Sequence, residues 1–236
     1  MRANAYSPTW FELFLRRIPP EQTRHESDFL ARHLPLPAFR NLLDICCGEG
    51  RHAAEMSSRG YAVTGVDRDE PAIARARVNA PAARFVITDM RELAMFAAPF
   101  DAAVCLWQSF GYFDSDTNAA IVRDIASLLR PSGRLVLDVY HRAYFESRAG
   151  TRTFQINGQE IEECRTISAA GGLKVELLAD NAKADLFQWQ VYLPEELAAV
   201  AERAGLSCVR SCSGFDETKP ASDQASRYQL VLERRG

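Results

Sequence analysis

Residues 41–53 read Asn-Leu-Leu-Asp-Ile-Cys-Cys-Gly-Glu-Gly-Arg-His-Ala, and they are the strongest indication of the fold. The apolar run 42–46 predicts a buried strand, and the segment 51–59 predicts a helix. Between them, Gly48 and Gly50 allow the backbone to adopt positive φ and to approach a ligand closely. A strand, a glycine turn and a helix in succession are typical of nucleotide-binding α/β proteins.

Strands and helices alternate in the same way as far as residue 140. Continuous apolar runs predict four further strands, at 61–67, 84–88, 100–107 and 134–140. Helical patterns separate them, one beginning near Pro71 and one covering 121–130. Apolar strands alternating with helices favour a parallel sheet that is covered on both faces. We therefore predict an α/β fold with a Rossmann-like, doubly wound sheet of seven strands, which binds its ligand at the carboxyl ends of the strands.

The segments on either side of this core predict three additions to it. Residues 1–40 show two helical patterns, one around Trp10 and one over 21–33, and predict an N-terminal helical cap. Residues 141–190 alternate in polarity and predict an inserted antiparallel β flap. The predicted flap strands are 153–156, 159–161, 164–167 and 173–178, with turns at Asn157-Gly158 and Gly171-Gly172.

Residues 191–236 predict a helix over 194–204 and then two strands, 206–212 and 227–233. These two strands are expected to form a C-terminal antiparallel hairpin at the edge of the sheet. The chain is thus expected to be a single domain, with residues 41–140 as its cofactor-binding core.

Composition narrows the class of protein. The chain has 236 residues, of which 47% are hydrophobic and 25% charged, as in an ordinary globular protein. No apolar run approaches the roughly 18 residues of a membrane span, and the first ten residues lack a secretory signal, so we expect a cytoplasmic protein. A net charge of -3 gives no general attraction to nucleic acid. The six cysteines form no CxxC pair and no zinc-like spacing with histidine, so no metal is expected.

Three aspartates lie at the carboxyl ends of the first three predicted strands, and they bear on the choice of cofactor. Asp44 lies at the end of its strand, where a carboxylate suits a cationic amino-acid moiety and would repel a pyrophosphate. Asp67 can accept the ribose hydroxyls of either NAD or S-adenosylmethionine. The carboxylate of Asp89 can accept a hydrogen bond from the exocyclic amino group of adenine. Each alone could simply cap a turn or a helix, but the three together favour S-adenosylmethionine.

Three segments, Leu42–His52, Gly65–Asp67 and Asp89–Arg91, resemble the successive cofactor motifs of class I S-adenosylmethionine-dependent methyltransferases. Trp107–Phe113 resembles a bacterial subgroup whose characterised relatives act on small molecules. The usual Pro-Gly-Gly before the fifth strand reads Pro131-Ser-Gly here, a departure that keeps the turn chemistry.

The resemblance implies a set of cofactor-binding residues. Those placed around the methionine portion are Asp44, Gly48 and Gly50, with Cys46 included in the same loop. Asp67 is placed on the ribose, Asp89 and Met90 at the adenine, Arg68 beside the adenine, and Leu106 on the floor of the site. The product would be S-adenosylhomocysteine.

Methyl transfer from a sulfonium is an in-line displacement, in which the protein mainly aligns the reacting atoms. A general base is needed only when the acceptor arrives protonated. Tyr112, after the fourth strand, could orient an acceptor amine or hydroxyl, or could pack against the N-terminal helices. His141, after the fifth strand, titrates near neutrality, but could instead be an exposed residue at the start of the flap. Tyr6 and Trp10 are candidates for closing over the cofactor.

The expected function is therefore methyl transfer to a nitrogen or oxygen of a small molecule. Three alternatives stay open at this point. The acceptor could be a macromolecule, such as tRNA or a protein, or the chain could be a non-catalytic S-adenosylmethionine-binding module. An NAD-linked dehydrogenase is the third, and Asp44 and Asp89 disfavour it.

Overall fold

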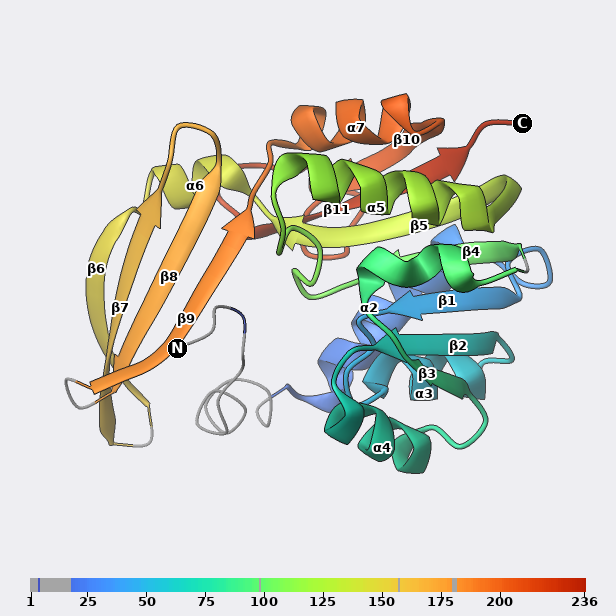
Figure 1. Ribbon diagram of the computed structural model, residues 1–236, viewed down its shortest axis with the longest axis horizontal. Coiled ribbons are helices and arrows are strands. Elements are labelled where there is room, and N and C mark those ends of the chain that lie inside the picture. Colours follow the sequence, from blue (N-terminus) through green and yellow to red (C-terminus); the bar gives the residue numbers. More distant parts are fainter. Residues whose placement is uncertain (1–3, 5–17, 98, 157, 180–181) are drawn as a thin grey trace.

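The computed structural model describes residue 4 and residues 18–97, 99–156, 158–179 and 182–236. The larger of its two sheets has seven strands in the order β10-β11-β5-β4-β1-β2-β3 (Figure 1). Its strands are β1 (Asn41–Ile45), β2 (Ala62–Asp67), β3 (Arg84–Ile87), β4 (Phe100–Cys105), β5 (Leu129–Tyr140), β10 (Leu206–Cys212) and β11 (Arg227–Arg234). The first five pair in parallel, and β11 is antiparallel to both β5 and β10. The predicted doubly wound sheet with a C-terminal antiparallel hairpin is confirmed.

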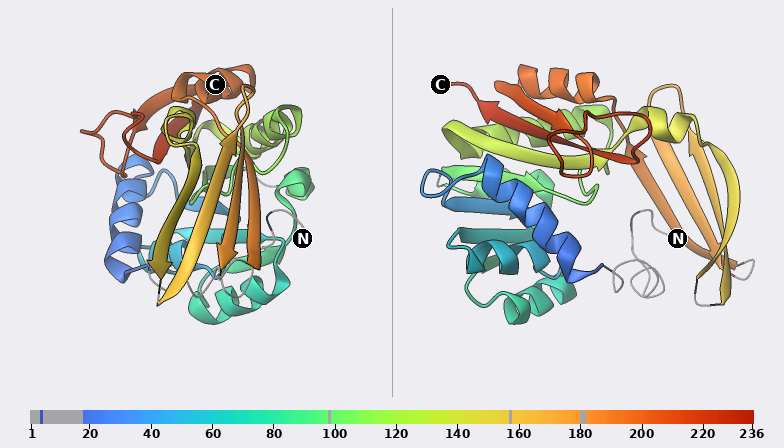
Figure 2. Two further views of the ribbon diagram at one scale, coloured as in Figure 1. Left: turned by 90° about the vertical axis from the view of Figure 1, so that its left-hand side faces the viewer. Right: turned by 180° about the vertical axis from the view of Figure 1, so that it is seen from behind.

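Helices cover both faces of this sheet, because neighbouring residues of a strand point to opposite sides. Leu42 belongs to the apolar cluster under α2, α3 and α4, whereas Leu43 belongs to the cluster under α5 and α7. Figure 2 shows α2 lying along the first of these faces. The bounds are α2 (Pro20–His33), α3 (Arg51–Ser58), α4 (Glu70–Asn79), α5 (Ser115–Leu128) and α7 (Pro194–Arg203), with a 3-10 helix η2 (Met90–Met95) packed near α5.

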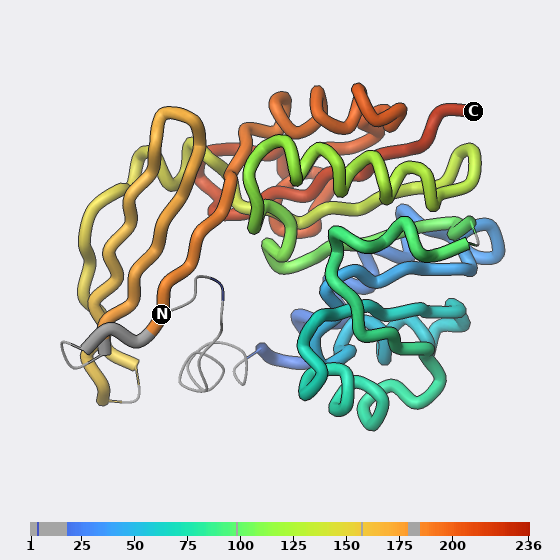
Figure 3. Tube along the Cα trace, in the orientation of Figure 1, coloured from blue at the N-terminus to red at the C-terminus, as the bar shows by residue number. Residues whose placement is uncertain are grey.

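The predicted flap is a separate antiparallel sheet of four strands in the order β6-β7-β8-β9. Its strands are β6 (Gly150–Ile156), β7 (Gln159–Ile167), β8 (Gly172–Ala179) and β9 (Ala182–Gln190), and the short helix α6 (Arg142–Glu146) joins it to β5. The tube in Figure 3 follows the chain from β5 into this sheet and back from β9 to α7. The flap faces the edge of the large sheet at which the parallel strands have their carboxyl ends (Figure 1).

Two details of the predicted flap are wrong. Residues 159–167 form one strand rather than two, and β9 was not predicted. Both strands carry charged side chains on their buried face, Glu163 and Arg165 in β7 and Asp185 in β9. These charges interrupt the alternation of apolar and polar residues by which a half-buried strand is recognised.

The region before β5 also departs from the prediction. Helix α5 begins at Ser115 rather than residue 121, because Asp114 caps it by accepting the Thr117 N–H at 2.9 Å. Strand β5 begins at Leu129 rather than residue 134, and Ser132 inside it has a φ of 59°.

The first predicted helix, with Trp10, and Tyr6 lie outside the described residues. Within the described part of the chain, no helix is both long and apolar enough to cross a bilayer.

Candidate functional site

The turn after β1 adopts the left-handed backbone that its glycines allow. Cys46, Gly48 and Gly50 have φ values of 59°, 53° and 78°. A Cβ atom added to Gly50 would lie 3.0 Å from the Cβ of Ala76, so Gly50 is needed for packing of the turn against α4. A Cβ atom added to Gly48 would meet nothing within 4 Å, so the backbone of Gly48 borders open space. A ligand can therefore approach the backbone closely at Gly48, as the sequence predicts.

Asp44 is a buried acid whose hydrogen-bonding capacity is not filled. Its side chain is 3% exposed, and Oδ2 has no hydrogen-bond partner among the described residues. Burial raises the pKa of Asp44 to about 7, with the charge of Asp67 adding to the shift and the guanidinium of Arg51 opposing it. A buried carboxylate oxygen without a donor is costly. A donor supplied by a ligand would remove that cost, so the residue fits the predicted cationic moiety.

Asp67 fixes the glycine turn from the end of β2. Its Oδ2 accepts the Gly48 N–H and its Oδ1 accepts the Asp69 N–H, both at 2.9 Å. Burial raises the pKa of Asp67, and the two N–H groups oppose that shift. Each oxygen keeps a second lone pair, so the carboxylate can still accept ribose hydroxyls. The neighbouring Arg68 is exposed and donates from Nη2 to the carbonyl of Asn4 at 3.0 Å.

Asp89 already has a protein partner. Its Oδ1 accepts the Arg91 N–H at 3.0 Å, and its two oxygens pair with Nε and Nη2 of the Arg91 guanidinium at 2.8 and 2.9 Å. These bonds lower the pKa of Asp89. Met90 and Leu106 are each 5% exposed and line the core beside the same edge. An adenine amino group would therefore share Asp89 with Arg91, which the sequence did not indicate.

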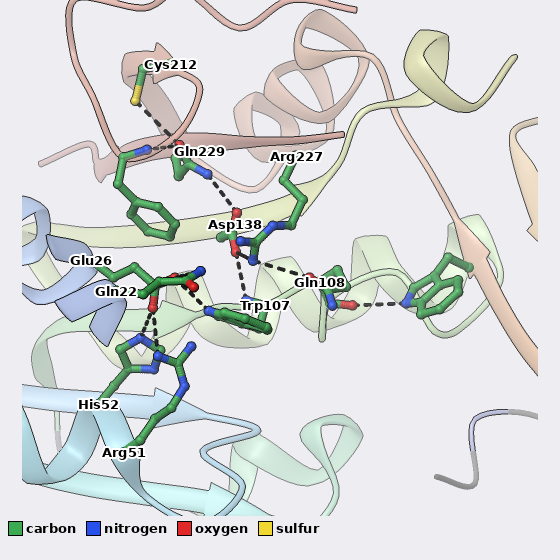
Figure 4. A network of polar contacts seen from close by, with 12 residues as sticks. Gln22, Glu26, Arg51, His52, Trp107, Gln108, Asp138, Cys212, Arg227 and Gln229 are labelled. Carbon is green, nitrogen blue, oxygen red and sulfur yellow. Dashed lines mark hydrogen bonds and ion pairs between the residues drawn. The ribbon is translucent and has the colours of Figure 1, made fainter. Parts of the chain in front are cut away.

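Sequence reasoning missed a buried polar network beside this turn (Figure 4). At its centre Glu26, on α2, is 1% exposed. Its Oε2 accepts Nη1 of Arg51 at 2.8 Å and Nε2 of His52 at 2.7 Å. Its Oε1 accepts Nε1 of Trp107 at 2.9 Å and Nε2 of Gln22 at 3.2 Å. Burial alone would raise the pKa of Glu26, but His52 and Arg51 together lower it to about 2.

The network continues to Asp138 on β5, which is fully buried. Its Oδ1 accepts Nε2 of Gln229 at 2.7 Å. Its Oδ2 accepts Nη1 of Arg227 at 2.6 Å and the Trp107 backbone N–H at 2.9 Å. Burial still raises the pKa of Asp138, against the effects of Arg227, Gln229 and Trp107.

Trp107 joins the two carboxylates of this network. The guanidinium carbons of Arg51 and Arg227 lie 4.5 and 4.6 Å from the centroid of its ring. Figure 4 shows the two guanidinium groups on opposite sides of the indole. Trp107 and Gln108 have φ values of 56° and 50°, two successive left-handed residues that are not glycine. Such strain persists where the surroundings hold it, and it often marks a functional loop.

Tyr112 lies where this loop meets the flap. Its ring is 5.9 Å from that of Trp189, whose Nε1 donates to the carbonyl of Gln108 at 3.0 Å. Burial raises the pKa of Tyr112, and it raises the pKa of Tyr140 nearby to about 12, so both phenols are neutral near pH 7. Tyr112 thus packs on the flap, against Trp189.

His141 is not the exposed residue that one reading of the sequence expected. It is 5% exposed and packs edge-to-face on Tyr228, with ring centroids 5.4 Å apart. Its Nδ1 is buried without a partner among the described residues, and burial lowers its pKa. Tyr228 belongs to the cluster under α5 and α7, so His141 lies on the sheet face opposite to the network of Asp138.

The chain is similar to known methyltransferases. A family described as a methyltransferase domain matches residues 42–133. YqeM of Bacillus subtilis, which bears a provisional methyltransferase name, is 24% identical over 202 residues, or 79% of this chain and 81% of its own.

Solved methyltransferases share the fold. CcbJ from Streptomyces caelestis superposes with a TM-score of 0.79 at 19% identity, covering 92% of this chain and 91% of its own. CalS10 from Micromonospora echinaspora, an amino pentose methyltransferase solved with S-adenosylmethionine bound, gives a TM-score of 0.70 at 20% identity. That match covers 99% of this chain and 100% of CalS10.

Proposed function

We propose that this chain, which belongs to the class I S-adenosylmethionine-dependent methyltransferases, methylates a nitrogen or oxygen atom of a small molecule. When bound, S-adenosylmethionine supplies a methyl group that its sulfonium has already activated. Asp44, Gly48 and Asp67 are the residues proposed to hold it, at the carboxyl ends of β1 and β2. The cytoplasm is the proposed compartment.

The observation that carries the proposal is a cluster of three aromatic side chains between the flap and the carboxyl ends of β4 and β5. Tyr112 comes from the loop after β4, Tyr140 from the end of β5, and Trp189 from β9 of the flap. The ring of Trp189 lies 5.9 Å from Tyr112 and 5.0 Å from Tyr140. Aromatic rings with neutral hydroxyl groups suit a compact acceptor that is largely removed from water. The amino pentose that CalS10 methylates is an acceptor of this size.

Within this cluster, we assign to Tyr112 the role of orienting the acceptor. Its neutral hydroxyl can accept a hydrogen bond from an amine or donate one to an oxygen. Holding the acceptor atom in line with the methyl group can lower the barrier of such a displacement by about 7–11 kcal/mol. His141 remains the second candidate. Its lowered pKa keeps it neutral and able to take a proton, but it faces α5 and α7 rather than the aromatic cluster.

A transfer assay with labelled methyl groups tests the small-molecule assignment. The protein is incubated with methyl-labelled S-adenosylmethionine and with either the low-molecular-weight or the macromolecular fraction of a bacterial extract. We expect label only in the first fraction, at a rate that changes little with salt. Label in RNA, lost steeply as salt rises, would contradict the proposal, because contacts to phosphates weaken in that way. Binding of S-adenosylhomocysteine with no transfer to either fraction would favour the non-catalytic alternative.

The role of Tyr112 is tested by the Tyr112→Phe substitution. Loss of one positioning hydroxyl should lower turnover by roughly 10- to 100-fold, because a neutral hydrogen bond contributes about 1–3 kcal/mol when the site is built around it. The dissociation constant of S-adenosylhomocysteine, measured by calorimetry, should stay unchanged. Unchanged turnover would exclude Tyr112, and weaker cofactor binding would assign it to a different contact.

A further inference from the structure

Two buried polar atoms of opposite charge near the glycine turn have no partner in the described part of the chain. One is Oδ2 of Asp44, and the other is Nη2 of Arg51. The two side chains influence each other electrostatically, yet no ion pair joins them. Buried groups of this kind are normally satisfied, so each calls for a partner from outside the chain.

The orientation of Arg51 is fixed by its other contacts. Nη1 donates to Oε2 of Glu26 and to Oγ1 of Thr23, both at 2.8 Å, and the guanidinium lies over Trp107. Because a guanidinium is planar and rigid, this arrangement also sets the direction of Nη2. The side chain cannot turn to Asp44 without giving up these bonds.

The backbone at Arg51 adds to the preference for an anion. Arg51 is the first residue of α3, directly after Gly50 at the N-cap position. The first N–H groups of a helix have no acceptor within it, and the helix dipole places partial positive charge there. Gly48, whose missing Cβ leaves open space, lies in the same turn, between the strand that carries Asp44 and the helix that carries Arg51.

We propose that Arg51 binds the α-carboxylate of the cofactor's methionine portion, while Asp44 binds its α-ammonium group. An α-amino acid carries both charges on one carbon, so a single ligand group would satisfy both orphaned atoms. Glu26, Thr23 and Trp107 then act as positioning residues that aim the guanidinium. The inference rests on the proposed function, because it takes the cofactor to be S-adenosylmethionine.

The test is calorimetric titration with two ligands that differ in one group. S-adenosylhomocysteine has both the α-ammonium and the α-carboxylate groups. Its decarboxylated analogue keeps the ammonium group but lacks the carboxylate. For Arg51→Met we expect binding of S-adenosylhomocysteine to weaken by about 10- to 100-fold, as for loss of a charge-assisted pair, and binding of the analogue to change less than about threefold. Arg24→Met is the matched control, because Arg24 is an exposed arginine on α2 that pairs with Glu21 at 2.7 Å. It should leave both affinities unchanged.

Equal affinity of wild type and Arg51→Met for S-adenosylhomocysteine would overturn the proposal. So would an equal loss for both ligands, since Arg51 would then only support the loop of Trp107. Should Arg51→Met fail to fold, Arg51→Lys keeps a cation beside Glu26, and a smaller loss confined to the carboxylate ligand is expected. If neither ligand binds the folded wild-type protein, the assignment of the cofactor itself fails, and this result differs from any that concerns Arg51 alone.

Discussion

Asp44 and Asp138 occupy similar places near the ends of β1 and β5, and both are removed from solvent. Their surroundings differ. Three donors surround Asp138, whereas Oδ2 of Asp44 has no partner among the described residues. Burial of an acidic side chain therefore does not by itself indicate a binding site. An acid whose hydrogen-bonding capacity is filled holds a loop in place, and one with an unfilled oxygen is available to a ligand.

The substitution Asp138→Asn tests the difference between these two acids most directly. Both oxygens of the Asp138 carboxylate accept hydrogen bonds, whereas an asparagine amide has only one oxygen that can accept. Arg227 would also lose its buried ionic partner. Removing one member of such a pair costs about 3–5 kcal/mol of folding free energy, so we expect a loss near 3 kcal/mol in urea denaturation. Glu49→Gln, which removes an exposed ion pair, is the control and should cost less than about 1 kcal/mol. A loss as small as that of the control would mean that the network does not hold the Trp107 loop.

Asp44→Asn should have the opposite effect on stability. The pKa of Asp44 is about 7 in the folded protein against 3.8 in the reference state. The folded state then binds more protons than the unfolded state between these values, so this group's contribution to stability falls as pH rises from 3.8 to 7. Removing the charge should stabilise the ligand-free protein at pH 8, by on the order of 2 kcal/mol.

The same substitution should weaken binding of S-adenosylhomocysteine by roughly 30-fold or more, because the ammonium loses a charged acceptor. Scanning calorimetry and titration calorimetry on one preparation measure the two effects. A variant that is less stable and binds normally would show that Asp44 is a structural residue like Asp138.

The smallest expected effect is a pH dependence of cofactor affinity. Only the ionised form of Asp44 attracts an ammonium group, and the groups that influence its charge are Arg51 and Asp67. Affinity for S-adenosylhomocysteine should therefore fall as pH drops below about 7, by up to about tenfold per pH unit. In Asp44→Asn the same titration should be nearly flat. A flat profile in the wild type would imply that Asp44 does not change its protonation on binding.

Most of the large sheet could be predicted because its signals are local. The apolar run of β1, the glycine turn and the helix that follows are adjacent in sequence, and their periodicities are those of the elements they form. The same holds for the acids at the strand ends, since parallel strands end at one edge. Strand β9 could not be found in this way, because Asp185 stands on its buried side among Phe187 and Trp189. Which residues pack against the buried side of β9 depends on the rest of the fold.

The sequence alone was sufficient to predict the succession of strands and helices in the cofactor half, the glycine turn at Gly48, and the positions of Asp44 and Asp67 at the ends of successive strands. Which buried acids have their hydrogen bonds satisfied depends on the tertiary structure. Glu26 reaches Trp107 across 81 positions of sequence, and Arg227 reaches Asp138 across 89. A strand or a turn depends on residues close along the chain, so its pattern can be read there. A hydrogen bond between distant residues exists only once helices and sheet have packed, and the partner that Asp44 lacks is likewise a property of that packing.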